Sequence, residues 1–173
     1  QKEAGRIRHL GFSCHGKLDV MKRFLEAYGS KMEFCQIQLN YLDWTFQEAK
    51  EKVELLRSYH IPVWVMEPLR GGRLASLEEQ YTEELRALRP DENTPAWAFR
   101  FLQTIPEVTM VLSGMSSMEQ LQDNIHTFET DRPLDQKEMD TLLGIADKLL
   151  QKKTLPCTAG HYCVSHCTQQ LDI

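Results

Sequence analysis

The sequence predicts an α/β fold built on a parallel sheet, because four short apolar runs alternate with amphipathic segments along the chain. Each run is long enough for one strand, and together they cover residues 9–12, 34–39, 62–66 and 108–112. Because the runs are compact and apolar, both faces of each strand are expected to be covered. Such strands build either an open doubly wound sheet or part of a barrel, and periodicity alone leaves both alternatives.

Capping patterns mark the starts of the helices between these strands. Thr45 with Glu48 has the spacing of a capping box, and Thr94 precedes a proline at the first helical position. Asp135 with Glu138 opens one more helix after the fourth strand. Apolar residues follow each start at helical spacing, so each helix is expected to pack one face inward.

Residues 111–124 combine a strand end, a Ser/Gly turn and a capped helix start. Ser116 and Glu119 have capping-box spacing, and an inward-facing apolar stripe follows at Met118, Leu121, Ile125 and Phe128. Backbone N–H groups of residues 114–117, at the positive end of this helix, are suited to a phosphate. A plain strand-turn-helix connection is the alternative.

Composition excludes several classes of partner. The formal charge of -5 provides no basic field for nucleic acid or an acidic membrane surface. No apolar run approaches the ~20 residues of a membrane span, and the N-terminus does not resemble a secretory signal. The chain has five cysteines, three of them near the C-terminus. This pattern is typical of a cytoplasmic chain with a local metal or redox site rather than a disulfide framework.

Four segments, residues 5–16, 35–41, 66–72 and 111–124, resemble the aldo/keto reductases in order and spacing. The resemblance is closest to a subgroup with a ferredoxin-like cysteine motif at the C-terminus. It implies that residues 1–150 form the C-terminal half of a (β/α)8 TIM barrel, strands five to eight, with a C-terminal helix. Residues 151–173 would form a cysteine-containing tail.

The same resemblance leaves the chain without a catalytic residue. The family's Asp, Tyr, Lys and His tetrad lies in the first half of the barrel, and no residue of this chain matches it. Tyr41, His15 and His60 are the other groups that could move a proton, but their positions favour packing or loop roles.

The resemblance also implies much of a cleft for NADP or NAD. Ser13 and Gln36 match residues that bind the nicotinamide carboxamide, with Cys14 where many members have Asn. Met66 replaces an aromatic residue that stacks on the nicotinamide ring. The loop expected around the pyrophosphate contributes Glu67, Leu69, Arg70, Gly71 and Gly72.

The turn after the fourth strand is expected to hold phosphate, through Ser113, Gly114, Met115 and Ser116. Asp123 and Asn124 match positions that meet the adenine. Gln120 stands where the family often has an arginine for the 2′-phosphate, so the choice between NADPH and NADH stays open.

The cysteine tail departs from a ferredoxin half motif, C-x2-C-x2-C-x3-C-P. Gly160 replaces the second cysteine and Thr168 the proline, which leaves three candidate ligands, Cys157, Cys163 and Cys167. The alternatives are an iron-sulfur cluster, a zinc site completed by a histidine, or no metal.

Three functions follow as hypotheses. The first is an NAD(P)-dependent oxidoreductase of which this chain is the cofactor-binding half, acting on a small carbonyl or alcohol substrate once the missing half completes it. The second is a non-catalytic nucleotide-binding half-barrel. The third is an iron-sulfur or zinc protein acting through its tail. A half-barrel exposes sheet edges, so self-association is also expected.

Overall fold

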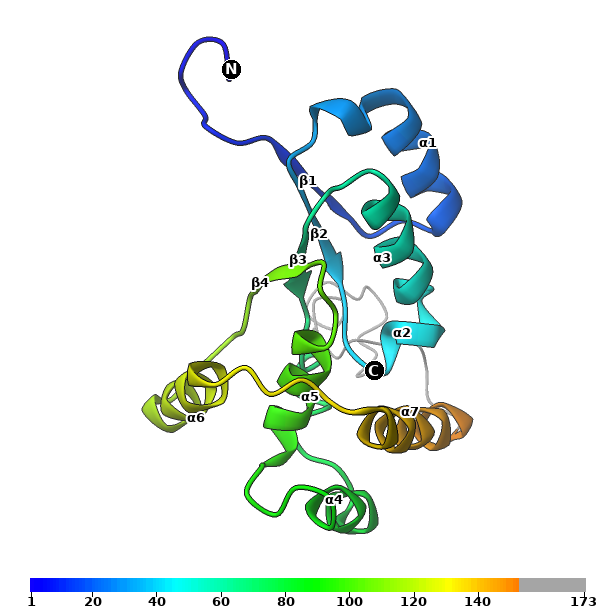
Figure 1. The fold of residues 1–173 in the computed structure, drawn as a ribbon, viewed down its shortest axis with the longest axis vertical. Helices are drawn as coiled ribbons and strands as arrows, with labels where there is room; N and C mark the ends of the chain where they lie inside the picture. Colours follow the sequence, from blue (N-terminus) through cyan, green and yellow to red (C-terminus); the bar gives the residue numbers. More distant parts are fainter. Residues whose placement is uncertain (153–173) are drawn as a thin grey trace, which may run out of the picture.

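The computed structural model describes residues 1–152, which form a four-stranded parallel sheet with helices (Figure 1). The strands lie side by side in chain order, β1-β2-β3-β4, as a right-handed series of crossovers would place them. The elements are β1 (Gly11–Cys14), α1 (Leu18–Tyr28), η1 (Gly29–Lys31), β2 (Phe34–Gln38), α2 (Asp43–Phe46), α3 (Ala49–Ser58), β3 (Val63–Met66), α4 (Glu79–Arg86), α5 (Thr94–Gln103), β4 (Val108–Val111), α6 (Met118–Glu129) and α7 (Gln136–Gln151). The predicted α/β fold with a parallel sheet is confirmed.

The sheet is buried on one face only. Alternate residues of β2 and β3 are fully buried in one core with apolar side chains of α1, α3, α5 and α7: Cys35, Ile37, Val63 and Val65. The residues between them point to the opposite face and are only partly buried: Phe34, Gln36, Trp64 and Met66. Figure 1 shows α1, α2 and α3 together on one side of β1 and β2. The expectation that both faces would be covered is therefore wrong for the described residues.

Two helix starts in this part of the chain differ from the sequence prediction, by one and by three residues. The segment after β2 divides into α2 and α3, because Glu48 adopts a left-handed backbone (φ 53°) that interrupts the helix. Glu48 is itself the N-cap of α3, so the capping box expected between Thr45 and Glu48 does not form. Asn93, not Thr94, caps α5 by accepting a hydrogen bond from the Ala96 N–H at 2.9 Å. The capping box of Asp135 and Glu138 is confirmed.

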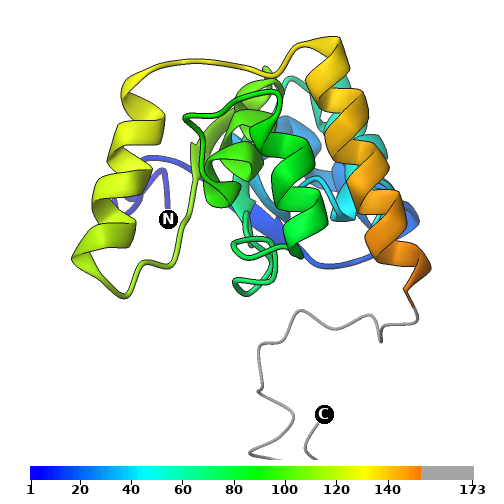
Figure 2. The same ribbon diagram turned by 90° about the horizontal axis from the view of Figure 1, so that it is seen from below.

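Helix α6 lies beyond β4 at one end of the molecule (Figure 2). Three of the four residues of its apolar stripe are exposed. Met118 is 66% exposed, Ile125 51% and Phe128 43%. The helix is held instead at its C-terminal end, where the buried Arg100 guanidinium donates to the carbonyls of Thr127 and Thr130 at 2.7 and 2.6 Å. Phe128 still contacts α5, because its ring lies 5.3 Å from the Phe99 ring. The expected inward packing is therefore wrong for Met118 and Ile125, whose side chains are exposed.

A buried polar network lies beneath the loop that follows β3. The Asn40 amide donates to Asp43 Oδ2 at 2.7 Å and to the Glu67 carbonyl at 2.9 Å. Arg70 Nε lies 3.3 Å from Asp43 Oδ2, and both side chains are almost completely buried. Arg70 Nε and Asp43 Oδ1 nevertheless have no aligned hydrogen bond among the described residues, so the contact is mainly electrostatic. The network fixes the path of the loop from below.

No helix among residues 1–152 is both long and apolar enough to cross a membrane.

We expect Asp43→Asn to lower the free energy of unfolding by about 3 kcal/mol, because it leaves the buried Arg70 charge uncompensated. Urea unfolding at one fixed protein concentration measures this loss. The control is Arg86→Gln, which breaks the exposed Arg86 and Glu79 pair (3.7 Å apart) and is expected to change stability by about 1 kcal/mol or less. Equal effects of the two substitutions would contradict a structural role for the buried pair.

We also expect the isolated 173-residue chain to self-associate. Strands β1 and β4 each have an unpaired edge, and apolar side chains are exposed beside β4 on Met110, Leu112 and α6. Ile125→Glu should lower the associated fraction, whereas Tyr28→Glu, at an exposed position on α1, should not. Light scattering over a concentration series distinguishes these outcomes, and a monomer at every concentration would contradict the expectation.

Candidate functional site

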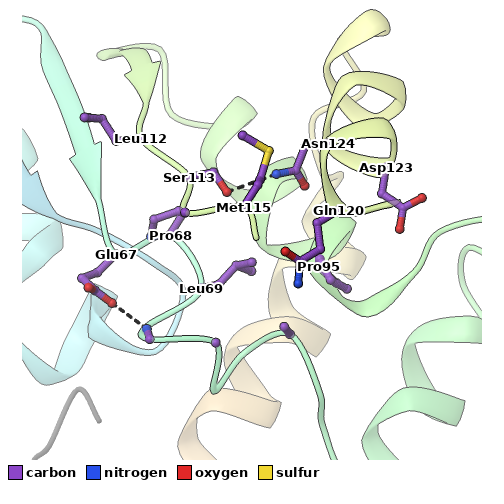
Figure 3. Close-up of a pocket in the computed structure, with 14 residues that line it drawn as sticks. Glu67, Pro68, Leu69, Pro95, Leu112, Ser113, Met115, Gln120, Asp123 and Asn124 are labelled. Carbon is purple, nitrogen blue, oxygen red and sulfur yellow. Dashed lines mark hydrogen bonds between the residues drawn. The ribbon is translucent and has the colours of Figure 1, made fainter. Parts of the chain in front are cut away.

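A cleft of about 290 Å³ opens between the loop after β3 and the segment joining β4 to α6 (Figure 3). Parallel strands all end at the same edge of the sheet, so these two loops meet above the carboxyl ends of β3 and β4. This is the edge at which α/β folds generally bind ligands. The first turn of α5 closes the cleft at Pro95.

The loop after β3 has an unusual backbone. Four of its residues have positive φ: Glu67 (57°), Arg70 (48°), Gly71 (64°) and Gly72 (87°). Non-glycine residues rarely adopt this conformation, and here the Asn40 contact to the Glu67 carbonyl and the burial of Arg70 hold it. A Cβ added at Gly72 would meet no atom within 4 Å, so the backbone there faces open space. A ligand can therefore approach this backbone closely.

The opposite wall is the turn from β4 into α6. Ser117, one residue later than expected, is the N-cap and accepts a hydrogen bond from the Gln120 N–H at 3.2 Å. Gln120 Oε1 in turn accepts the Ser116 N–H at 2.7 Å. The N–H groups of Gly114 and Met115 make no hydrogen bond to another described residue. Together with the positive end of the α6 dipole, they form a surface that favours an anion.

The charged side chains that line this cleft are both acidic. Glu67 Oε2 accepts a hydrogen bond from the Gly71 N–H at 2.5 Å, and Asp123 Oδ2 accepts one from the Asn93 amide at 3.2 Å. Asn124 donates to Ser113 Oγ at 3.1 Å across the turn (Figure 3). The groups that attract an anion here are therefore backbone N–H groups rather than cationic side chains.

The structure brings most of the predicted phosphate and adenine residues to this one cleft. Those lining it are Glu67, Leu69, Gly72, Ser113, Gly114, Met115, Gln120, Asp123 and Asn124. Ser116 lies next to the cleft and does not line it.

The residues predicted to meet the nicotinamide gather on the open face of the sheet. Ser13 of β1 is paired with Gln36 of β2, and the Gln36 amide donates to Met66 Sδ at 3.6 Å. Cys14 lies on the opposite face and packs against the core, because successive strand residues alternate between faces. The expectation that Cys14 adjoins the same ligand surface is not met.

Arg70 is the clearest departure from the predicted site. Its guanidinium was expected at the pyrophosphate, but the side chain is 2% exposed, lies beside Asp43 and stacks over the Phe46 ring at 5.3 Å. A buried carboxylate attracts the guanidinium away from the cleft. Sequence reasoning missed Asn40 and Asp43, although two polar residues directly after a buried strand were the available signal.

Gly71, expected in the pyrophosphate loop, also lines the cleft. Further cleft residues were missed, namely Pro68, Ala75, Pro95 and Leu112. No local pattern places Pro95 of α5 beside the β4 turn.

The three residues considered for proton transfer, Tyr41, His15 and His60, do not line the cleft. Burial raises the pKa of the Tyr41 hydroxyl well above its usual range, and this hydroxyl has no hydrogen-bond partner among the described residues. Tyr41 therefore packs rather than transferring protons, as the sequence favoured. Within residues 1–152 no cluster of three or more His, Cys, Asp or Glu side chains could hold a metal ion. The tail cysteines Cys157, Cys163 and Cys167 lie outside the described residues.

Comparisons with known proteins agree with this architecture. Among solved structures, the chain is similar to the holo form of an aldo-keto reductase from Bacillus halodurans, with 24% identity and a TM-score of 0.66, over 83% of this chain and 52% of that one. It is also similar to an aldose reductase from Giardia lamblia, with 18% identity and a TM-score of 0.63, over 85% of this chain and 47% of that one. At these identities the likeness concerns the fold. A search of curated proteins found no match.

The chain spans about half the length of these solved structures. The sequence model of the aldo/keto reductase family matches residues 1–147, which include the whole sheet and both walls of the cleft. This chain belongs to the aldo/keto reductase family, a family of oxidoreductases.

Proposed function

We propose that this chain is the dinucleotide-binding half of an NAD(P)-dependent aldo/keto reductase, contributing strands five to eight of a (β/α)8 barrel. The one-sided sheet supports the proposal, because a barrel strand has helices outside and side chains of the other strands inside. The two unpaired edges, β1 and β4, are where four further strands would join. We also propose a cytoplasmic location for this chain, on the basis of its cysteine pattern.

The cleft between residues 67–72 and 113–124 is the observation that carries the proposal. It combines exposed glycine backbone, N–H groups without partners among the described residues, and the positive end of α6. These features suit a pyrophosphate, which needs close approach and backbone donors. The cleft is small for a whole dinucleotide. The nicotinamide end would lie along the open sheet face, near Ser13, Gln36 and Met66.

A bound nicotinamide supplies hydride for carbonyl reduction. The chain's own residues would bind and orient that ring: the Ser13 hydroxyl and the Gln36 amide suit a carboxamide, and the Met66 thioether can cover a ring face. Protonation of the carbonyl oxygen would come from the tetrad of the other barrel half.

Gly114→Leu tests the proposed site directly. A Cβ at Gly114 meets no atom within 4 Å, so the substitution should leave the fold intact while filling the space that the pyrophosphate needs. We expect binding of NADH or NADPH, measured by calorimetry, to weaken about tenfold or more. The control is Gly144→Leu on α7, where a Cβ also meets no atom within 4 Å. Equal binding by the two variants would contradict a phosphate site at Gly114.

The chain by itself should show no carbonyl reduction with NADPH or NADH above background. General acid catalysis typically contributes about 10²–10⁴-fold, and loss of the tetrad also removes the groups that orient the substrate. The assay follows cofactor absorbance with an aldehyde substrate. Turnover by the pure chain that one substitution in residues 1–152 abolishes would refute this assignment of roles.

A non-catalytic nucleotide-binding module is the second candidate function, supported by the same cleft. Turnover after addition of a family N-terminal half would favour the reductase. Binding without turnover in that mixture would favour the module. A role carried by Cys157, Cys163 and Cys167 concerns residues outside the described structure.

A further inference from the structure

The charge of the cleft affects whether it binds NAD(H) or NADP(H) more tightly. Its charged lining side chains are Glu67 and Asp123, and the described residues place no lysine or arginine on its wall. NADP(H) differs from NAD(H) by a 2′-phosphate, which brings further negative charge into the same site. Proteins that accept such a phosphate usually neutralise it with an arginine or lysine.

The loop after β3 carries two basic residues, Arg70 and Arg73, and neither lines the cleft. Arg70 is held below the cleft by its contact with Asp43, and releasing it would leave a buried carboxylate unpaired. Arg73 belongs to the same loop but does not line the cleft. Gln120, which does line it, can donate a hydrogen bond to a phosphate but cannot neutralise one.

The acidic groups suit the unphosphorylated nucleotide instead. A ribose with free hydroxyls can donate hydrogen bonds to a carboxylate, the pairing by which acidic residues select NAD over NADP in other nucleotide sites. Asp123 already accepts from Asn93 through Oδ2, and the structure assigns no hydrogen bond to its second oxygen among residues 1–152. Repulsion of the 2′-phosphate by acidic side chains and the available Asp123 oxygen both favour the nucleotide without that phosphate.

We propose, on the basis of the proposed function, that this cleft selects a dinucleotide without a 2′-phosphate, NAD(H) rather than NADP(H). The selection comes from Asp123 together with an uncharged residue at Gln120, because Glu67 lies on the opposite wall, beside the pyrophosphate that both dinucleotides share (Figure 3).

Calorimetric titration of the 173-residue chain with NADH and with NADPH tests this selection. We expect NADH to bind about tenfold more tightly at low ionic strength. Raising the salt concentration from about 0.05 to about 0.5 M should bring the NADH and NADPH affinities closer together, because salt screens the repulsion between partly exposed charges. A preference based on shape alone would not change with salt.

Gln120→Arg should reduce or reverse the preference by improving NADPH binding. Gln122→Arg adds the same charge two residues along α6 at an exposed position outside the cleft wall, and it should leave the NADH to NADPH ratio nearly unchanged. Arg73→Gln should also leave the ratio unchanged.

Tighter binding of NADPH by the parent chain would overturn the inference, and loss of that preference in Arg73→Gln would identify Arg73 as the cation responsible. Equal responses to Gln120→Arg and Gln122→Arg would overturn it as well. If neither nucleotide binds the parent chain at millimolar concentration, the proposed function itself fails, which is a different result from binding with the opposite preference.

Discussion

All four strands run parallel, so every strand-to-helix loop leaves the sheet at the same edge, and this constraint places the candidate site. The loops after β3 and β4 come from segments some forty residues apart in the sequence but share one cleft. The same arrangement places helices on one side of the sheet, which leaves Phe34 and Trp64 stacked on the other at a ring separation of 3.9 Å. A surface of this kind is stable when something covers it, which the second half of a barrel would do.

The Asn40, Asp43 and Arg70 network connects the core to the cleft. It uses a buried charge pair to hold backbone in a conformation that non-glycine residues rarely adopt. Its second consequence is electrostatic, because it removes the loop's best-placed cation from the ligand surface. The anion binding that we propose for the cleft would then rest on backbone N–H groups and the α6 dipole, while the side-chain charge of the cleft is negative. The proposed pyrophosphate recognition and the proposed selection against an additional phosphate are thus compatible in one site.

The sequence allowed prediction of features that depend on local pattern. The four strands and the capping box at Asp135 are local. Most residues predicted to meet phosphate or adenine line one cleft, while their roles stay a prediction. Features that depend on distant partners were not predictable. The direction of the Arg70 side chain depends on Asp43, twenty-seven positions earlier. The exposure of Ile125 depends on which other elements pack against its face of α6. Cap positions at Asn93 and Ser117 differed by one residue because adjacent polar side chains compete for the same N–H group.

The two walls of this cleft are proposed to bind the diphosphate of a nicotinamide dinucleotide. Amide-resolved NMR of the labelled chain during titration with NADH tests this binding, because the contacts expected are to backbone N–H groups. We expect the largest chemical-shift changes on the amides of Gly71, Gly72, Gly114 and Met115, with smaller changes near Ser13 and Gln36. Shifts confined to residues away from both loops, or none at saturating nucleotide, would contradict it.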